Sequence, residues 1–117
     1  MNISHNGLGE LVTTFETDGE QLTAGTLIKL SSGRAVAASE GDGFTGVAAD
    51  NSRNSKIAVQ VGGYVKVQYT GNAGFGRQFV VAKTADSIEF CDASTENAVP
   101  VKVISVDSDK HIAGILI

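Results

Sequence analysis

Apolar and polar residues alternate with almost no interruption along residues 57–71, whose sequence is IAVQVGGYVKVQYTG. A period of two places every second side chain on the same face, so this segment is predicted to be a β-strand with one buried face. The parity does not change across the two central glycines. The apolar residues on both sides of them have odd numbers: Ile57, Val59, Val61, Val65, Val67 and Tyr69.

Gly62 and Gly63 are the ambiguous positions of this segment. In a two-residue hairpin loop, Val61 and Tyr64 would face each other and the parity of the buried face would change. The pattern therefore argues against such a loop. Two interpretations keep the parity: one strand that bends sharply at the glycines, as strands do at barrel corners, or a three-residue loop with a β-bulge. We favour the bend.

The rest of the chain reads as short strands separated by turns. Glycine occurs 14 times and proline once, and valine, isoleucine and threonine outnumber the strong helix formers in most windows, which favours strands over helices. Hairpins are expected over residues 26–38, 77–92 and 100–117, and a further strand over residues 44–49. The predicted fold class is all-β: a compact single-domain β-barrel or sandwich of about eight to ten short strands with a flexible N-terminal arm.

The closing hairpin has apolar residues on both faces. Along PVKVISV, Val101 and Val103 alternate with Ile104 and Val106, and the partner strand HIAGILI carries isoleucine and leucine at both parities. Apolarity on two faces is typical of strands in the centre of a sandwich or barrel. We therefore expect the chain to end inside its core, at Ile117.

The N-terminal end behaves differently. Residues 1–10 are predicted to be a flexible arm, and residues 11–117 a single β domain. The segment that follows the arm is ambiguous, because its Val-Thr-Thr run favours a strand while its apolar residues also fit a helical stripe: Leu8, Leu11, Val12 and Phe15. We favour a strand over residues 11–17.

The net charge of minus four is unevenly distributed along the 117 residues. Four acids and no base occupy residues 1–20, whereas the remaining residues balance nine acids with nine bases. This balance argues against direct nucleic-acid binding, because such proteins concentrate lysine and arginine on one face. No apolar run approaches the roughly 18 residues of a membrane helix, and MNISHNGLGE lacks the features of a signal peptide. We expect a soluble protein made in the cytoplasm, with no membrane partner.

The candidate chemistry is sparse. Cys91 is the single cysteine, and it cannot build a zinc site with only His5 and His111. The pair Asp107 and Asp109 lacks the following ligands of a calcium loop and is better explained as a turn. The sequence thus predicts no catalytic residue, no metal site and no cofactor, and it favours a binding or structural module over an enzyme.

Several longer stretches resemble the small β-rich capsid decoration, or cement, proteins of tailed phages. The resemblance covers roughly residues 11–117, and the stretches that carry it are TAGTLIKLSSGRAV, GDGFTGVA, VQVGGYVKVQYTG and VISVD. KTADSIEFCDASTEN replaces the glycine-rich segment often present in this family. The resemblance implies a non-enzymatic virion protein, made in the bacterial host cytoplasm, that binds the major capsid protein on the capsid exterior and stabilises the assembled head. It also implies a homo-oligomer, with a trimer favoured, and an N-terminal arm that adds a strand to the capsid surface.

Candidate contact residues follow from these expectations. The apolar residues of the first segment are suited to an edge strand that joins a partner sheet. Tyr64 lies with Lys66 on the polar face of the 57–71 strand, where an ordinary exposed cross-strand tyrosine is the favoured explanation and a contact residue the alternative. The predicted capsid or subunit contacts are Leu8, Leu11, Val12, Phe15, Tyr64 and Lys66. An alternative function is a carbohydrate- or cell-surface-binding β module, as in a head fibre, that displays Tyr64 and Tyr69; the absence of tryptophan argues against it.

Overall fold

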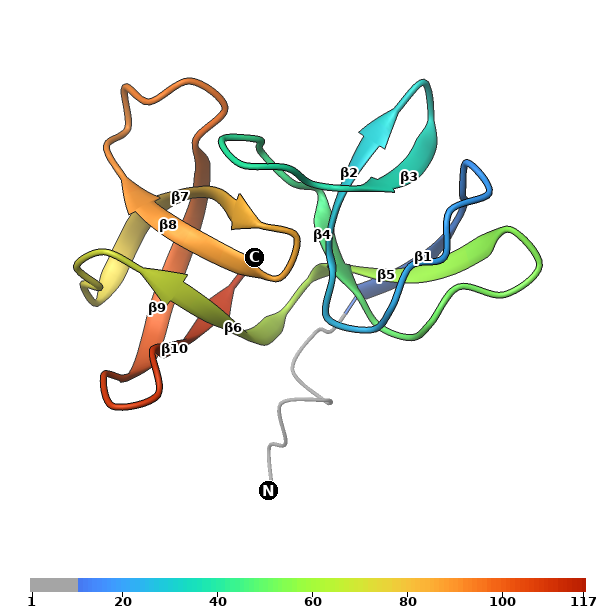
Figure 1. Cartoon of the computed structure of the whole chain (residues 1–117). Coiled ribbons are helices and arrows are strands. Elements are labelled where there is room, and N and C mark those ends of the chain that lie inside the picture. The colour runs from blue at the N-terminus through green and yellow to red at the C-terminus, as the bar shows by residue number, and fades with distance from the viewer. Residues whose placement is uncertain (1–10) are drawn as a thin grey trace, which may run out of the picture.

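The structure, a computed structural model, describes residues 11–117 of the chain. This range forms ten β-strands and contains no helix, which confirms the all-β prediction. Figure 1 shows the strands in two groups that lie side by side. One is an open sheet made from the first half of the chain, here called the first sheet, and the other is a closed barrel made from the second half. The predicted arm over residues 1–10 lies outside the described residues.

The first sheet has the strand order β1-β5-β4-β2-β3. The β2–β3 hairpin turns at Ser32 and Gly33, whose φ values of 52° and 79° fit the two-residue type I′ turn that suits twisted strands. The two edge strands of this sheet, β1 and β3, approach each other at one point, where Thr17 forms a single parallel bridge with Ala35. The strands are β1 (Leu11–Glu16), β2 (Leu27–Ser31), β3 (Arg34–Ala37), β4 (Gly46–Ala48) and β5 (Lys56–Gly62).

The barrel has the cyclic strand order β10-β6-β8-β7-β9. Four of its strand pairs are antiparallel, and the barrel closes through a parallel pairing of β6 with β8 in which Gln68, Tyr69 and Thr70 face successive residues of β8. The predicted hairpins over residues 77–92 and 100–117 are both present. The strands are β6 (Tyr64–Thr70), β7 (Gly76–Thr84), β8 (Ser87–Cys91), β9 (Val99–Asp107) and β10 (Ile112–Leu116).

A bend at Gly63 joins the two groups. The strands on either side of it do not pair with each other: β5 pairs with β1 and β4, whereas β6 pairs with β10 and β8. Gly63 has a φ of 97°, a conformation that residues with a Cβ atom rarely adopt. This confirms the predicted bend and excludes a hairpin at the glycines. The buried odd face is also confirmed on both sides of the bend.

The two groups share one topology. When β6 to β10 are matched in order to β1 to β5, the barrel order becomes identical to that of the first sheet, and the parallel β6–β8 closure corresponds to the contact between β1 and β3. The registers agree for β1–β5 and β6–β10: Phe15 faces Ile57 as Val67 faces Ala113. The chain therefore contains two copies of one structural unit. The second copy, β6 to β10, is closed into a barrel, and the first copy, β1 to β5, stays open along β1.

Two equivalent backbone hydrogen bonds support this match, one beside the β1–β3 bridge and one beside the β6–β8 pairing. The Thr17 N–H donates to the Ser55 carbonyl at 2.9 Å, and the Tyr69 N–H donates to the His111 carbonyl at 3.0 Å. Both acceptor residues have positive φ values, 61° for Ser55 and 55° for His111. Two chain segments with little sequence in common thus form the same local structure.

The core consists of two clusters that follow the two units. The smaller one fills the first sheet, and the larger one fills the barrel. Four residues from the first half belong to the larger cluster: Leu27, Ala38, Phe44 and Val47. Phe44, expected at the start of a strand, lies instead in the loop between β3 and β4, which pairs with β7 through hydrogen bonds from Gly41 to Ala82 and from Ala82 to Asp42. The two units therefore share a core.

The closing hairpin requires a correction. β9 and β10 each have two neighbouring strands, as predicted for central positions, and Ile117 is half-buried against the larger core. The prediction of burial on both faces of β9 is wrong, because Lys102 and Ile104 are exposed. A barrel encloses only one face of each strand, so the apolar residues of the other parity lie on its outside.

Candidate interaction surface

Gln60 braces the bend between the two units. Its side chain is buried, and its amide nitrogen donates to the carbonyl oxygens of Gly62 and Tyr64, both at 3.0 Å. The backbone N–H of Ile117 donates to the Gly63 carbonyl at 3.0 Å. The end of the chain and one buried glutamine therefore fix the bend, and with it the position of Tyr64.

Tyr64 lies across the outside of the barrel. It faces Leu116 on β10, and its hydroxyl reaches Ser105 on β9 with an oxygen–oxygen distance of 3.2 Å. The intervening residue is Gly114, where an added Cβ would overlap both the Tyr64 hydroxyl and the Ser105 hydroxyl. A glycine at this position leaves room for the Tyr64 ring beside β10. The predicted contact residue Tyr64 is thus half-buried and held by its neighbours.

Lys66 follows Tyr64 on the same face and is exposed. It lines a groove of about 550 Å³ between the barrel and the loop that precedes β2. Threonine hydroxyl groups contribute to its lining from both sides, Thr23 and Thr26 from the loop and Thr84 from β7. Among the described residues that line the groove, Lys66 is the only base and Asp86 the only acid.

The predicted residues of the first segment occupy β1. Leu11 and Val12 are exposed to 59% and 43% of their full areas, which is high for large apolar side chains in a strand. Phe15 is half-buried and packs against the smaller core, so part of its side chain contributes to the fold. Leu8 lies outside the described residues. The sequence prediction of a strand in this segment is confirmed.

The expectation that Tyr69 is displayed for a ligand is wrong. Its side chain is 6% exposed and belongs to the larger core. Its ring meets those of Phe90 and His111 with centroid distances of 5.6 and 5.5 Å. Tyr64 and Tyr69 therefore form no aromatic platform, and this removes the observation that favoured a carbohydrate-binding module.

Sequence analysis missed an exposed apolar surface on the barrel. Phe75 and Ile104 are exposed to 68% and 45% of their full areas. Phe75 directly precedes Gly76, which pairs with Val103, the residue before Ile104 in β9. We call the surface that they begin the barrel face; it continues across β7, β9 and β10 and comprises Phe75, Arg77, Pro100, Lys102, Ile104 and Leu116. The apolar residues on both faces of the closing hairpin had suggested a buried Ile104.

The loop that carries Phe75 is held in place. The Gln78 side-chain amide donates to the Phe75 carbonyl at 3.1 Å. An added Cβ at Gly74 would lie 2.8 Å from that amide nitrogen, so glycine leaves room for this hydrogen bond. Gly76, with a φ of 78°, then turns the chain into β7. The exposed Phe75 is therefore part of a turn that the Gln78 side chain stabilises.

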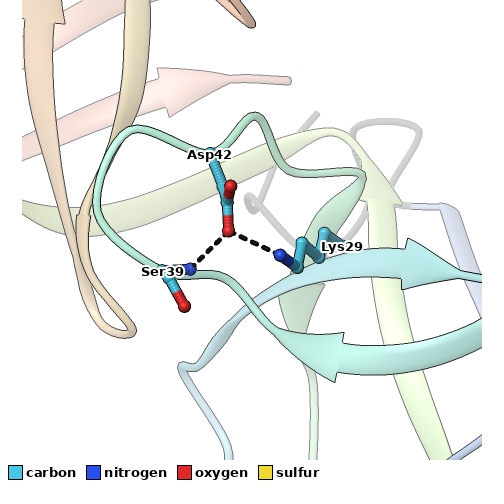
Figure 2. Close-up of polar contacts among 3 residues, drawn as sticks. All are labelled: Lys29, Ser39 and Asp42. Atoms are coloured by element: carbon cyan, nitrogen blue, oxygen red, sulfur yellow. Dashed lines mark hydrogen bonds and ion pairs between the residues drawn. The ribbon is translucent and has the colours of Figure 1, made fainter.

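The loop between β3 and β4 contains an ion pair, drawn in Figure 2. Asp42 accepts hydrogen bonds from the Lys29 ammonium group at 2.7 Å and from the Ser39 backbone N–H at 2.8 Å. These two bonds lower the pKa of Asp42 below its ordinary value, with Lys29 contributing most. On the neighbouring side, Glu40 accepts a bond from Lys83 at 3.0 Å and raises the pKa of Lys83. The two pairs tie the loop to β2 and β7.

The described part of the chain gives no positive indication of other chemistry. Within residues 11–117, histidine, cysteine and acidic side chains form no group of three suited to a metal ion, and no helix is long and apolar enough to cross a membrane. Cys91 is half-buried and forms no disulfide. Comparisons with family models, curated proteins and solved structures found no match to this chain.

Proposed function

We propose that this protein is a non-enzymatic structural component of a phage virion, which binds the major capsid protein on the outer surface of the capsid and stabilises the assembled head. It acts without a cofactor, as a homo-oligomer for which a trimer is favoured. It is made in the bacterial host cytoplasm and becomes part of the virion. The sequence resemblance to decoration proteins motivates this proposal, and the exposed edge strand β1 is the structural observation that supports it.

The edge strand β1 is suited to strand addition. Its inner side pairs with β5 along its whole length. Within residues 11–117, its other side pairs only through the bridge between Thr17 and Ala35, so the backbone from Leu11 to Glu16 is open along that side. Leu11 and Val12 supply exposed apolar surface at the same place. An extended segment of a capsid protein can add to such an edge through backbone hydrogen bonds, with side chains giving specificity.

Binding to isolated heads tests the proposal. Purified protein is mixed with heads that lack it, the heads are sedimented, and the bound protein and the temperature of thermal disruption are measured. The proposal predicts saturable co-sedimentation and a higher disruption temperature. An absence of co-sedimentation at about micromolar protein, a concentration at which standard protein interfaces bind, would reject it.

A matched pair of variants tests the role of β1. The double variant Leu11→Ser/Val12→Ser removes exposed apolar side chains and should weaken capsid binding at least about tenfold, with little change in stability. Leu30→Ser is the control, because Leu30 is a similarly exposed residue of β2, at 41%. Equal binding by both variants would show that β1 is not the contact. Deletion of residues 1–10 separately tests the predicted arm.

A further inference from the structure

The barrel face offers a partner side chains rather than a strand edge. Its three strands, β7, β9 and β10, each have a paired neighbour on both sides, so the sheet continues across this surface without an open edge. The edge strand β1 differs, because its backbone is open along one side. The barrel face is therefore a surface of a different kind, and its side chains determine what can bind there.

Outward-facing side chains form a continuous row across four strands of the barrel. In the register, each member of the row faces the next: Tyr64 on β6, Leu116 on β10, Lys102 on β9 and Arg77 on β7. The predicted contact residue Tyr64 therefore borders the barrel face. Tyrosine and arginine are enriched among the residues that dominate the binding energy of protein interfaces.

Apolar surface surrounds the two bases of this row. Arg77 and Lys102 line a shallow pocket of about 340 Å³ together with Pro100, Val101 and Leu116. Exposed Phe75 and Ile104 extend the apolar area beyond this pocket. Contiguous exposed apolar surface with a few polar groups marks a protein-binding site more often than an ordinary solvated surface.

The equivalent surface of the first unit is covered. There Val47 on β4 faces Gln60 on β5, and both are buried, at 6% and 8% exposure. Val47 packs in the larger core with residues of the barrel. By the match between the two units, this pair corresponds to Lys102 and Leu116, which face each other on β9 and β10. The protein thus packs this surface of one unit against a neighbour and leaves it open on the other.

The two bases of the barrel face are not compensated by acids. Arg77 and Lys102 lie directly opposite each other and are exposed, and like charges at such positions of a sheet repel. Within residues 11–117, the ion pairs involve Lys29 and Lys83, so Asp92, which follows β8, pairs with neither base. The residues around the two bases on the outer side are apolar: Phe75, Phe79, Pro100, Ile104 and Leu116. Carboxylate groups of a partner would relieve the repulsion, whereas a basic or neutral partner would not.

A protein partner fits this surface better than a nucleic acid. Nucleic-acid binding relies on many phosphate contacts, whereas this face has two bases set among large apolar side chains. Arginine binds a carboxylate through two parallel hydrogen bonds. Such a contact is stronger where surrounding apolar surface excludes water. The face therefore suits an apolar protein surface that carries carboxylate groups.

We propose that the barrel face is a second surface at which this protein binds the major capsid protein, and that it meets there an apolar patch bearing carboxylate groups. This contact rests on the proposed function and adds to it a place and a chemistry. Recognition at β1 uses backbone hydrogen bonds and apolar side chains, whereas recognition at the barrel face depends on charge. The two contacts therefore differ in their response to salt, because salt screens exposed charges.

Binding of charge variants to isolated heads tests this contact. Arg77→Glu/Lys102→Glu reverses both charges of the face and should weaken co-sedimentation with heads at least about tenfold. Arg53→Glu/Lys110→Glu is the matched control, because it also reverses one exposed arginine and one exposed lysine, but outside the barrel face. The control should bind heads like the wild type. Thermal melts of both variants establish that they are folded.

Salt dependence separates this contact from the one at β1. Wild-type binding to heads should weaken as salt is raised from about 0.05 to about 0.5 M. Arg77→Gln/Lys102→Gln removes the two charges, so its weaker binding should change much less over the same range. Phe75→Ser/Ile104→Ser removes apolar surface but keeps the charges, so it should bind weakly and retain the salt dependence of the wild type.

Two further measurements address other partners. Sedimentation of the free protein reports on contacts between copies, and its mass should be the same for the wild type and Arg77→Glu/Lys102→Glu. Fluorescence anisotropy with a labelled single-stranded DNA of about 20 nucleotides, long enough for a site of ordinary size, should show no binding that depends on these two bases.

Failure of this contact and failure of the proposed function give different results. Heads that bind the wild type and Arg77→Glu/Lys102→Glu equally would reject the barrel face as a contact while the proposed function stands. A wild-type protein that does not bind heads would reject the proposed function and this contact together. An equal loss of binding in the Arg53→Glu/Lys110→Glu control would show that net charge governs binding, and it would also overturn the contact.

The measurements without heads can overturn the contact as well. A lower mass of the free Arg77→Glu/Lys102→Glu variant would assign the barrel face to a contact between copies of this chain. DNA binding that the same variant loses would assign the face to phosphate groups. Unchanged mass and no such DNA binding, together with the loss of head binding, support the capsid contact.

Discussion

Gln60→Leu should destabilise the protein by weakening the bend between its two units. Leucine has nearly the volume of glutamine and suits a buried site, but it has no hydrogen-bond donor. The substitution removes two hydrogen bonds, to the carbonyl oxygens of Gly62 and Tyr64. Each is worth about 0.5 to 1.5 kcal/mol net, and a buried carbonyl left without a partner costs about 1 to 3 kcal/mol. The expected loss in the free energy of unfolding is therefore about 2 to 4 kcal/mol.

The measurement is urea denaturation followed by far-UV circular dichroism. Gln68→Leu is the matched control, because Gln68 has the same side chain on the same continuous segment but is exposed; it should change stability by less than about 0.5 kcal/mol. A Gln60→Leu variant as stable as wild type, or a control that is equally destabilised, would refute the assigned role of Gln60.

Gln60→Glu gives an independent check of the same contact. A carboxylate accepts hydrogen bonds but cannot donate one, so at neutral pH it would face two carbonyl oxygens with a negative charge. Burial and these oxygens should raise the pKa of the introduced carboxyl group in the folded state. The destabilisation should therefore exceed that of Gln60→Leu at neutral pH and decrease as the pH falls and the group becomes protonated.

Three further predictions concern other parts of the fold, each measured by thermal and chemical denaturation. Gly46→Ala should lower stability by more than about 2 kcal/mol, because the added methyl group would overlap the backbone of β5 in a closely packed region; unchanged stability would mean that β4 can move away. The ion pair of Asp42 with Lys29 lowers the pKa of Asp42, so its stabilisation is complete above the ordinary value of 3.8 and is lost as the pH falls through the lowered pKa. Asp42→Asn should accordingly be less stable at neutral pH and less sensitive to acid, and an acid dependence equal to that of wild type would contradict this. Thr17→Val should raise stability by about 1 kcal/mol, since the buried Thr17 hydroxyl has no hydrogen-bond partner within residues 11–117; a loss would show that the hydroxyl is satisfied.

The hydrophobic pattern predicted the strands well, because burial of one face imposes a period of two. It also predicted the bend, since an unchanged parity is incompatible with a two-residue hairpin loop. The hydrogen bonds by which the Gln60 side chain holds this bend could not be predicted in this way. Gln60 has the parity of the polar face, and its burial follows from the barrel packing beside β5, which no local pattern reports.

The sequence pattern did not predict the structural repeat or the barrel face, for a related reason. Matched positions carry residues of different character, such as Thr17 and Tyr69, or Val47 and Lys102. Each of these residues suits its own surroundings, so the two halves keep a strand order while losing sequence similarity. Of the predicted contact residues within the described part of the chain, the structure leaves Leu11, Val12 and Lys66 exposed.

The unequal closure of the two units has a consequence for dynamics. Three consecutive parallel pairings hold β6 to β8, whereas a single bridge holds β1 to β3. Amide hydrogens of β1 should exchange with solvent through local opening of the first unit, while those of β6 should exchange only when the whole molecule unfolds. The protein thus combines a rigid half with a half that can open at low free-energy cost, so a partner strand could enter along β1 without unfolding the rest.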